Sequence, residues 1–304
     1  MFKKRFVCWY KQLVVNWHLN WSTFRARNLL KNSGPIIVLI DNSVLGHGRT
    51  HESVFLKEKV NWITGEDTYL DVLHRAPIDI KQKYGETVFE NVQYLPGIVH
   101  LAQLGLLELK TSSELLSERQ HHPTYRFLGR KGYFDYNLFE KISKQIKSVD
   151  GYDLPDLSDW FARNPTTINK VFYSTDIDPL GLYPDNDKRQ QDRIAQSNDP
   201  LYKDLVSLFP GKKYIKDAWH IRTAEINNLF CFLTMDFRLC KNVEENKTKE
   251  PVSSLHTKVL TPKGFGENIG VYPINPYLCE WAEGDYLQSS ARLRKKLKKM
   301  RNEK

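Results

Sequence analysis

Apolar residues near the middle of the second half of the chain recur first at helical spacing and then without interruption. Between residues 215 and 226 the helical positions are Ile215, Ala218, Ile221, Ala224 and Ile226. This pattern predicts a helix that Asn227 and Asn228 end. The apolar run that follows, 229–234, is too short for a helix and predicts a buried strand. A helix joined to a strand by two residues is half of an α/β unit.

Similar patterns predict the other elements. The β-branched run 36–40 is typical of a central parallel strand that is covered on both faces. Residues 107–110 and 256–260 predict two more strands. Helices are expected at 1–31, where the helix would pack on the core, at 53–63, at 88–104 with an interruption at Pro96-Gly97, after 111–113, at 135–147, at 200–209 and after 236.

The order of these elements predicts the fold class. It is strand–helix–strand–helix, then a polar, turn-rich stretch at about 121–200, then helix–strand–helix–strand. Crossovers between parallel strands are right-handed, so this order predicts an α/β fold with a parallel sheet and helices on both faces.

Charge is concentrated at the two ends of the chain. Of the net charge of +9, residues 1–31 carry +7 with no acid and residues 292–304 carry +7, which leaves −5 for residues 32–291. Basic ends around an acidic middle suit a protein that holds a polyanion with its ends, although such tails can also serve solubility alone. The candidate nucleic-acid-binding residues are Arg292, Arg294, Lys295, Lys296, Lys298 and Lys299. Aromatic residues between the N-terminal cations could also stack bases or lie on a membrane surface.

Other features of the sequence predict a cytoplasmic protein without a membrane span. No apolar run approaches about 18 residues, the length that a transmembrane helix needs. Asn16 and His18 interrupt what would be the apolar stretch of a signal peptide. The four cysteines are far apart and form no CxxC pair, which predicts reduced thiols.

Three aspartates stand where chemistry is expected. Asp41 and Asp236 each follow a predicted strand, and Asp217 lies on the apolar face of the predicted helix. If the strands at 36–40 and 229–234 are neighbours, both strand-end acids lie in one crevice at the carboxyl edge of the sheet. Clustered carboxylates need a cation or a shared proton. An all-oxygen site suits Mg²⁺ or Mn²⁺ rather than zinc.

These segments resemble the PIN (PilT N-terminus) nuclease domain. The resemblance rests on Asp41-Asn42-Ser43-Val44-Leu45 after an apolar strand, and on the stretch from Lys216-Asp217-Ala218-Trp219-His220 to Leu233-Thr234-Met235-Asp236. It implies a Rossmann-like α/β/α sandwich and a ribonuclease that depends on Mg²⁺ or Mn²⁺. The implied metal ligands are Asp41, Asp217 and Asp236, and the acids of the site should converge within reach of the ion.

The resemblance also implies one catalytic glutamate, for which there are two candidates. Members of the family usually carry Ser or Thr at the end of a strand and Glu six residues later, a spacing that Ser112 and Glu118 satisfy. Glu118 is therefore preferred, and Glu114 is the second choice because Thr111 and Glu114 also fit a helix capping box. Thr234 could hold a carboxylate or a water molecule near the ion, or serve only as a β-former.

The resemblance divides the chain into three parts: a basic, aromatic N-terminal extension at 1–31, a PIN-like domain at 32–275 with an insertion at about 121–200, and a basic tail at 276–304. The expected activity is that of an endoribonuclease, with RNA preferred over DNA as the partner. A protein inhibitor and a second copy of the chain are further candidate partners. The alternatives are a catalytically inactive nucleic-acid-binding protein and a nuclease that acts on DNA. His220 is expected to be a hydrogen-bonded helix residue rather than a substrate contact.

Overall fold

The structure is a computed structural model. It describes residues 2–48, 50–61, 67–112, 114–115, 118, 146, 148–149, 192–209, 211 and 214–279. Most of the helix predicted at 135–147 and most of the insertion predicted at about 121–200 lie outside these ranges, as do residues 280–304.

A parallel four-stranded sheet forms the centre of the fold, in the order β4-β1-β5-β6. Its strands are β1 (Ile36–Ile40), β4 (Leu107–Lys110), β5 (Cys231–Leu233) and β6 (Lys258–Leu260). β1 pairs with β4 on one side and with β5 on the other, and all the pairs are parallel. From β1 the chain adds β4 on one side of that strand, and it then returns to add β5 and β6 on the other side. The switch point of the topology therefore lies between β1 and β5. This arrangement confirms the predicted parallel sheet. It also makes β1 and β5 neighbours, which was the condition for Asp41 and Asp236 to share one crevice.

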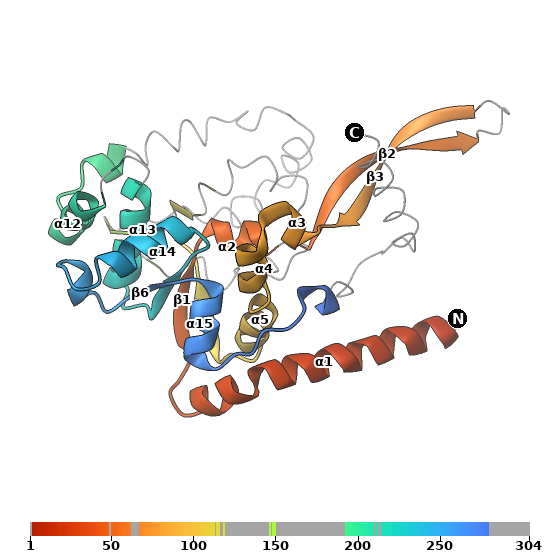
Figure 1. The fold of residues 1–304 in the computed structure, drawn as a ribbon, viewed down its shortest axis with the longest axis horizontal. Helices are drawn as coiled ribbons and strands as arrows, with labels where there is room; N and C mark the ends of the chain where they lie inside the picture. Colours follow the sequence, from red (N-terminus) through yellow and green to blue (C-terminus); the bar gives the residue numbers. More distant parts are fainter. Residues whose placement is uncertain are drawn as a thin grey trace, which may run out of the picture.

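Helices cover both faces of the sheet (Figure 1). They are α1 (Phe2–Leu30), α2 (Asn42–His47), α3 (Ile80–Tyr84), α4 (Glu86–Val92), α5 (Leu95–Gln103), α12 (Pro200–Leu208), α13 (Tyr214–Ile226), α14 (Phe237–Glu245) and α15 (Pro262–Ile269), with short 3₁₀ turns η1 (Val252–Ser254) and η2 (Pro276–Cys279). The helices expected at 200–209, in the stretch ending at residue 226 and after residue 236 are confirmed. Residues 114, 115 and 118, after β4, are also helical.

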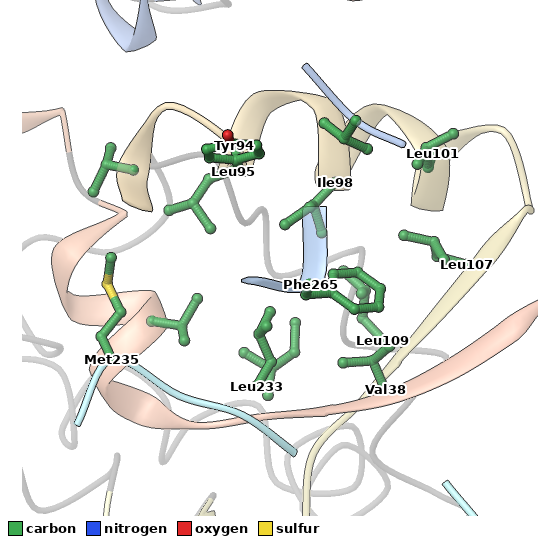
Figure 2. Close-up of a cluster of buried hydrophobic side chains, with 14 of the residues drawn as sticks. Val38, Tyr94, Leu95, Ile98, Leu101, Leu107, Leu109, Leu233, Met235 and Phe265 are labelled. Atoms are coloured by element: carbon green, nitrogen blue, oxygen red, sulfur yellow. The ribbon is translucent and has the colours of Figure 1, made fainter. Parts of the chain in front are cut away.

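The two faces of β1 belong to two different cores, as its continuous apolar sequence predicted. Val38 and Ile40 lie in one core with side chains of α4, α5 and α15, part of which Figure 2 shows. Leu39 lies in the other core, with side chains of α12 and α13. Alternate residues of a strand point to opposite faces, so a strand between two helical layers needs apolar residues at every position.

α1 packs against the same side of the sheet as α5 and α15. Ala26 and Leu30 are buried in the first core. Gly97 on α5 allows the close approach, because a Cβ atom there would lie 2.6 Å from a side-chain atom of Val271 and 2.9 Å from Oγ of Ser22. The expectation that residues 1–31 form a helix on the core is confirmed for α1.

The helix predicted at 53–63 is wrong. Residues 51–61 form β2 (His51–Asn61), which pairs in antiparallel fashion with β3 (Asp67–Pro77). The hairpin extends away from the central sheet (Figure 1). Residues 51–61 are extended because they pair with β3, and the segment 53–63 on which the helix prediction rested does not include that strand. Gly65 between the two runs was the available hairpin signal.

The helix predicted at 88–104 is two helices, α4 and α5, separated by a turn at Gln93 and Tyr94. Pro96 lies in the first turn of α5, where a proline costs no backbone hydrogen bond. The proline that interrupts the pattern therefore lies at the start of a second helix and does not bend one long helix.

Candidate active site

The carboxyl edge of the sheet gathers the predicted acids. Asp41 and Asp236 follow β1 and β5, which are neighbours in the sheet. α13 precedes β5 in the chain and is linked to it by a short turn with Asn228 at a positive φ of 52°. A helix that leads directly into a strand of the sheet runs antiparallel to it, so α13 begins at the carboxyl edge. Asp217, in the first turn of α13, is therefore at the same edge.

Hydroxyl groups join the ends of β1 and β5. Thr234 is completely buried, and its Oγ1 donates a hydrogen bond to Oδ2 of Asp41 at 2.7 Å and accepts one from N of Asp236 at 3.0 Å. Oγ of Ser43 donates to the same Oδ2 atom of Asp41 and accepts from N of Met235 at 2.9 Å. These bonds fix the orientation of the Asp41 carboxylate. The role of Thr234 is therefore more than that of a β-former.

Asp236 is the N-cap residue of α14. Its Oδ1 atom accepts hydrogen bonds from N of Arg238 at 3.0 Å and from N of Leu239 at 3.1 Å. These amides are among those that an α-helix leaves unsatisfied at its N-terminus. The carboxylate thus has a structural role at the start of the helix, at the place where the resemblance implies a metal ligand.

A buried histidine lies among the other acids. Nε2 of His220, on α13, is 3.6 Å from Oε1 of Glu118, and Nζ of Lys216 is also 3.6 Å from that atom. Burial lowers the pKa of His220, but Glu118 and the negative charges of Asp41 and Asp217 outweigh this effect and raise the pKa to about 9. These five residues therefore interact electrostatically, and we call them the acidic cluster: Asp41, Glu118, Lys216, Asp217 and His220.

The same contacts act on Glu118 in the opposite sense. Burial favours the neutral carboxyl group and raises its pKa, but His220 and Lys216 outweigh burial, so the pKa of Glu118 is lowered. Glu118 is therefore ionised at neutral pH. Nδ1 of His220 is also buried and has no hydrogen-bond partner among the residues that the structure describes.

The structure separates the two candidate glutamates. Glu114 is buried, and its Oε1 accepts hydrogen bonds from Oγ of Ser148 at 2.7 Å and from Nη2 of Arg193 at 3.1 Å. The predicted capping box with Glu114 is replaced by a hydrogen bond from N of Leu115 to Oγ of Ser112 at 3.3 Å. Glu114 thus belongs to a buried ion pair with Arg193, whereas Glu118 belongs to the acidic cluster.

A ready-made metal site is not present in the described part of the chain, where no three His, Cys, Asp or Glu side chains come together as ligands. The sequence predicted that four acids converge on one ion, and this convergence is not observed for them: Asp41, Asp217, Asp236 and Glu118. The chemistry of the donors still fits Mg²⁺ or Mn²⁺, because these ions take oxygen ligands and Mg²⁺ usually keeps several waters beside one or two carboxylates. The raised pKa of His220 shows that the cluster carries surplus negative charge.

Three side chains at this edge of the sheet were not singled out from the sequence as part of a site: Ser43, Lys216 and His220. His220 is three residues after Asp217 on α13, and residues at this spacing are neighbours on the helix surface. That spacing was the available signal. The predicted nucleic-acid-binding residues of the tail, 292–299, lie outside the described residues.

Comparison with known proteins adds no relative to this description. No family model, curated protein or solved structure matches the chain. Within the described ranges, no helix combines the length and the apolar character that crossing a membrane requires. Any functional conclusion therefore rests on the geometry of the carboxyl edge.

Proposed function

We propose that this protein is a metal-dependent nuclease that cleaves RNA phosphodiester bonds at the carboxyl edge of its sheet. The observation that supports this function best is the joining of two acid-bearing strand ends: Thr234 donates to Asp41 and accepts from the amide of Asp236. Glu118 and Asp217 lie in the same electrostatic neighbourhood, since Glu118, Asp217 and Asp41 all raise the pKa of His220. The resemblance of these segments to PIN domains points to the same chemistry.

Asp41, Asp217 and Asp236 would hold the ion in this proposal. A bound Mg²⁺ or Mn²⁺ would supply a Lewis acid that lowers the pKa of a water molecule and stabilises charge on the phosphate. The hydroxyl groups of Ser43 and Thr234 hold the Asp41 carboxylate in one orientation. A carboxylate held in this way loses little conformational entropy when it binds a cation.

His220 and Lys216 would balance the acids while no cation is bound. Each lies 3.6 Å from Oε1 of Glu118, and a protonated histidine lowers the cost of burying several carboxylates together. This balance keeps Glu118 ionised. An ionised carboxylate can accept a proton from the attacking water, which is the role that we propose for Glu118.

Cleavage assays on matched RNA and DNA test the proposal. The full chain is incubated with end-labelled single-stranded RNA, and with DNA of the same sequence, in Mg²⁺, in Mn²⁺ and with a chelator. RNA should be cut only with metal, and Asp41→Asn should stop the cleavage because it removes a charge from the site. Metal-independent cleavage, or wild-type activity of Asp41→Asn, would contradict the proposal.

Other outcomes of the same assay identify the alternatives. Cleavage of DNA but not of RNA would keep the site and change the substrate. RNA binding without cleavage in either metal would favour a catalytically inactive nucleic-acid-binding protein. Asp79→Asn is a suitable control, because Asp79 is an exposed helix-capping aspartate of α3 and is not part of the cluster.

A further inference from the structure

One face of α1 carries large apolar side chains that the core does not use. They are between 46% and 63% exposed and consist of Tyr10, Leu13, Trp17, Trp21 and Phe24. Their spacing of three or four residues places them on one face of the helix. The buried residues of the helix, among them Ala26 and Leu30, lie on the opposite face. We call the exposed residues the α1 stripe.

The α1 stripe is long enough to be a binding surface. Tyr10 and Phe24 are 14 residues apart, which corresponds to about 21 Å of helix at about 1.5 Å per residue. The stripe also extends beyond the helix, because the ring centroid of Trp21 lies 5.3 Å from that of Tyr272, which is itself 40% exposed. Contiguous apolar surface of this kind marks an interaction site more often than isolated exposed residues do.

The α1 stripe is remote from the acidic cluster. α1 ends at Leu30 and β1 begins at Ile36, so the C-terminal end of the helix lies at the amino edge of the sheet, whereas Asp41 and Asp236 follow the carboxyl ends of their strands. α1 forms one long side of the molecule (Figure 1). A partner bound along the stripe would leave the carboxyl edge accessible.

The charge of this part of the chain indicates which partner fits. Residues 1–31 contain seven Lys and Arg and no acid, and two of these cations are exposed: Arg25 on α1 and Lys31 directly after its end. A second copy of α1 would bring like charges together. The surface of an anionic membrane would instead attract them, and Trp and Tyr rings prefer the level of the lipid headgroups.

We propose that α1 lies flat on the surface of an anionic phospholipid membrane, with the α1 stripe in the boundary between headgroups and acyl chains. Interfacial helices have this composition: Trp, Phe and Leu on one face, and Lys or Arg beside it. Single-stranded RNA fits the surface less well. Leu13 offers no ring for stacking, and proteins bind such strands in charged grooves rather than on the outer side of a helix. The inference is independent of the proposed nuclease activity.

Vesicle binding by the full chain tests the inference. Co-sedimentation is measured with phosphatidylcholine vesicles that contain about one-quarter phosphatidylserine, and with vesicles of phosphatidylcholine alone. The wild-type protein should bind the anionic vesicles more tightly, and about 0.5 M salt should weaken this binding. Trp17→Ser with Phe24→Ser should reduce binding at least about tenfold, since it removes the two most exposed side chains of the stripe.

Leu29 provides a matched control on the same helix. It is 55% exposed, but it lies about 120° around the helix axis from Trp17, outside the stripe. Leu29→Ser should therefore bind anionic vesicles within about twofold of the wild type. Lys31→Glu is a second variant, which should lower binding to anionic vesicles and leave binding to neutral vesicles unchanged. Circular dichroism melts of each variant establish that it is folded.

Two results would overturn the inference. The first is a wild-type protein that binds neither kind of vesicle, and the second is a double variant that binds vesicles as the wild type does. In the second case, loss of affinity for single-stranded RNA by the double variant would make the stripe a nucleic-acid surface. Conversion of a wild-type dimer to a monomer by the double variant, measured by analytical ultracentrifugation, would instead assign the stripe to a second copy of the chain.

Discussion

Replacing Asp236 with asparagine separates the two roles that this residue has in our interpretation. One role is structural, because Oδ1 accepts hydrogen bonds from the amides of Arg238 and Leu239 at the start of α14. The other is the proposed contribution of negative charge to a metal site. The carbonyl oxygen of an asparagine can accept the same two hydrogen bonds, so Asp236→Asn preserves the first role and removes the second.

The structural cost of this substitution should be small. Asn and Asp are about equally good N-cap residues, so the main loss is the attraction between the carboxylate and the helix dipole, about 0.3–1 kcal/mol. Relief of repulsion with Asp41 offsets part of this loss. The melting temperature should therefore fall by less than about 4 °C.

The effect on cleavage should be much larger. Removing a group that only orients a metal ligand typically costs about 10- to 100-fold in activity or metal affinity. Loss of a charged ligand should cost at least about 100-fold in the rate of metal-dependent RNA cleavage. The rate is measured under single-turnover conditions, so that product release does not limit it.

Asp79→Asn is the matched control for this experiment. Asp79 is the N-cap residue of α3, and its Oδ1 accepts a hydrogen bond from N of Gln82 at 3.0 Å. The same chemical change therefore occurs at a helix start outside the cluster, and cleavage should be unaffected. If Asp236→Asn retained the wild-type rate, the reasoning would be refuted and Asp236 would be a helix cap alone.

Further changes probe the cluster, the ion pair of Glu114 and the tail. Thr234→Val should destabilise the fold by about 1–3 kcal/mol in urea unfolding, because it leaves buried polar groups without their partner, whereas Thr234→Ser should not. Glu114→Gln should reduce stability by breaking its pair with Arg193, and Glu118→Gln should instead reduce cleavage. The pKa of His220 is raised from 6.5 to about 9, so its charged form contributes stability that is fully present below about pH 6.5 and is lost as the pH rises through about 9. In His220→Gln the melting temperature should therefore depend less on pH across this window than it does in the wild type. Removing residues 292–304 should lower the slope of log K for RNA against log salt by about 0.7–0.9 for each phosphate that the tail neutralises; an unchanged slope would assign the tail to solubility.

The features of this fold that the sequence predicted depend on local patterns of apolar residues and on the order of the elements. β1 was recognisable because Val38, Leu39 and Ile40 are all apolar, and the structure buries them between two cores. The order of the elements and the handedness of their crossovers predicted a parallel sheet, and the structure supplies the neighbouring position of β1 and β5. The shared edge for Asp41 and Asp236 is a consequence of that topology.

Features that depend on distant partners were not predictable in this way. β2 needs β3 as its partner, and no periodicity within residues 53–63 identifies it. Arg193 forms its ion pair with Glu114 across 79 residues of sequence. The raised pKa of His220 depends on burial and on charges from separate segments. Such effects arise only when the chain is folded, and each residue alone has an ordinary alternative role.

The hydrogen bond from the Thr234 hydroxyl group to Asp41 also has a consequence for when, during synthesis of the chain, this edge of the sheet can assemble. The two residues are 193 positions apart, and at a synthesis rate of about 5–20 residues per second Thr234 is added about 10 to 40 s after Asp41. During this interval β1 and β4 can already pair on the ribosome, but β5 and the residues directly after it, Thr234 and Asp236, have not been made. The nascent chain therefore lacks the assembled carboxyl edge until translation has passed β5.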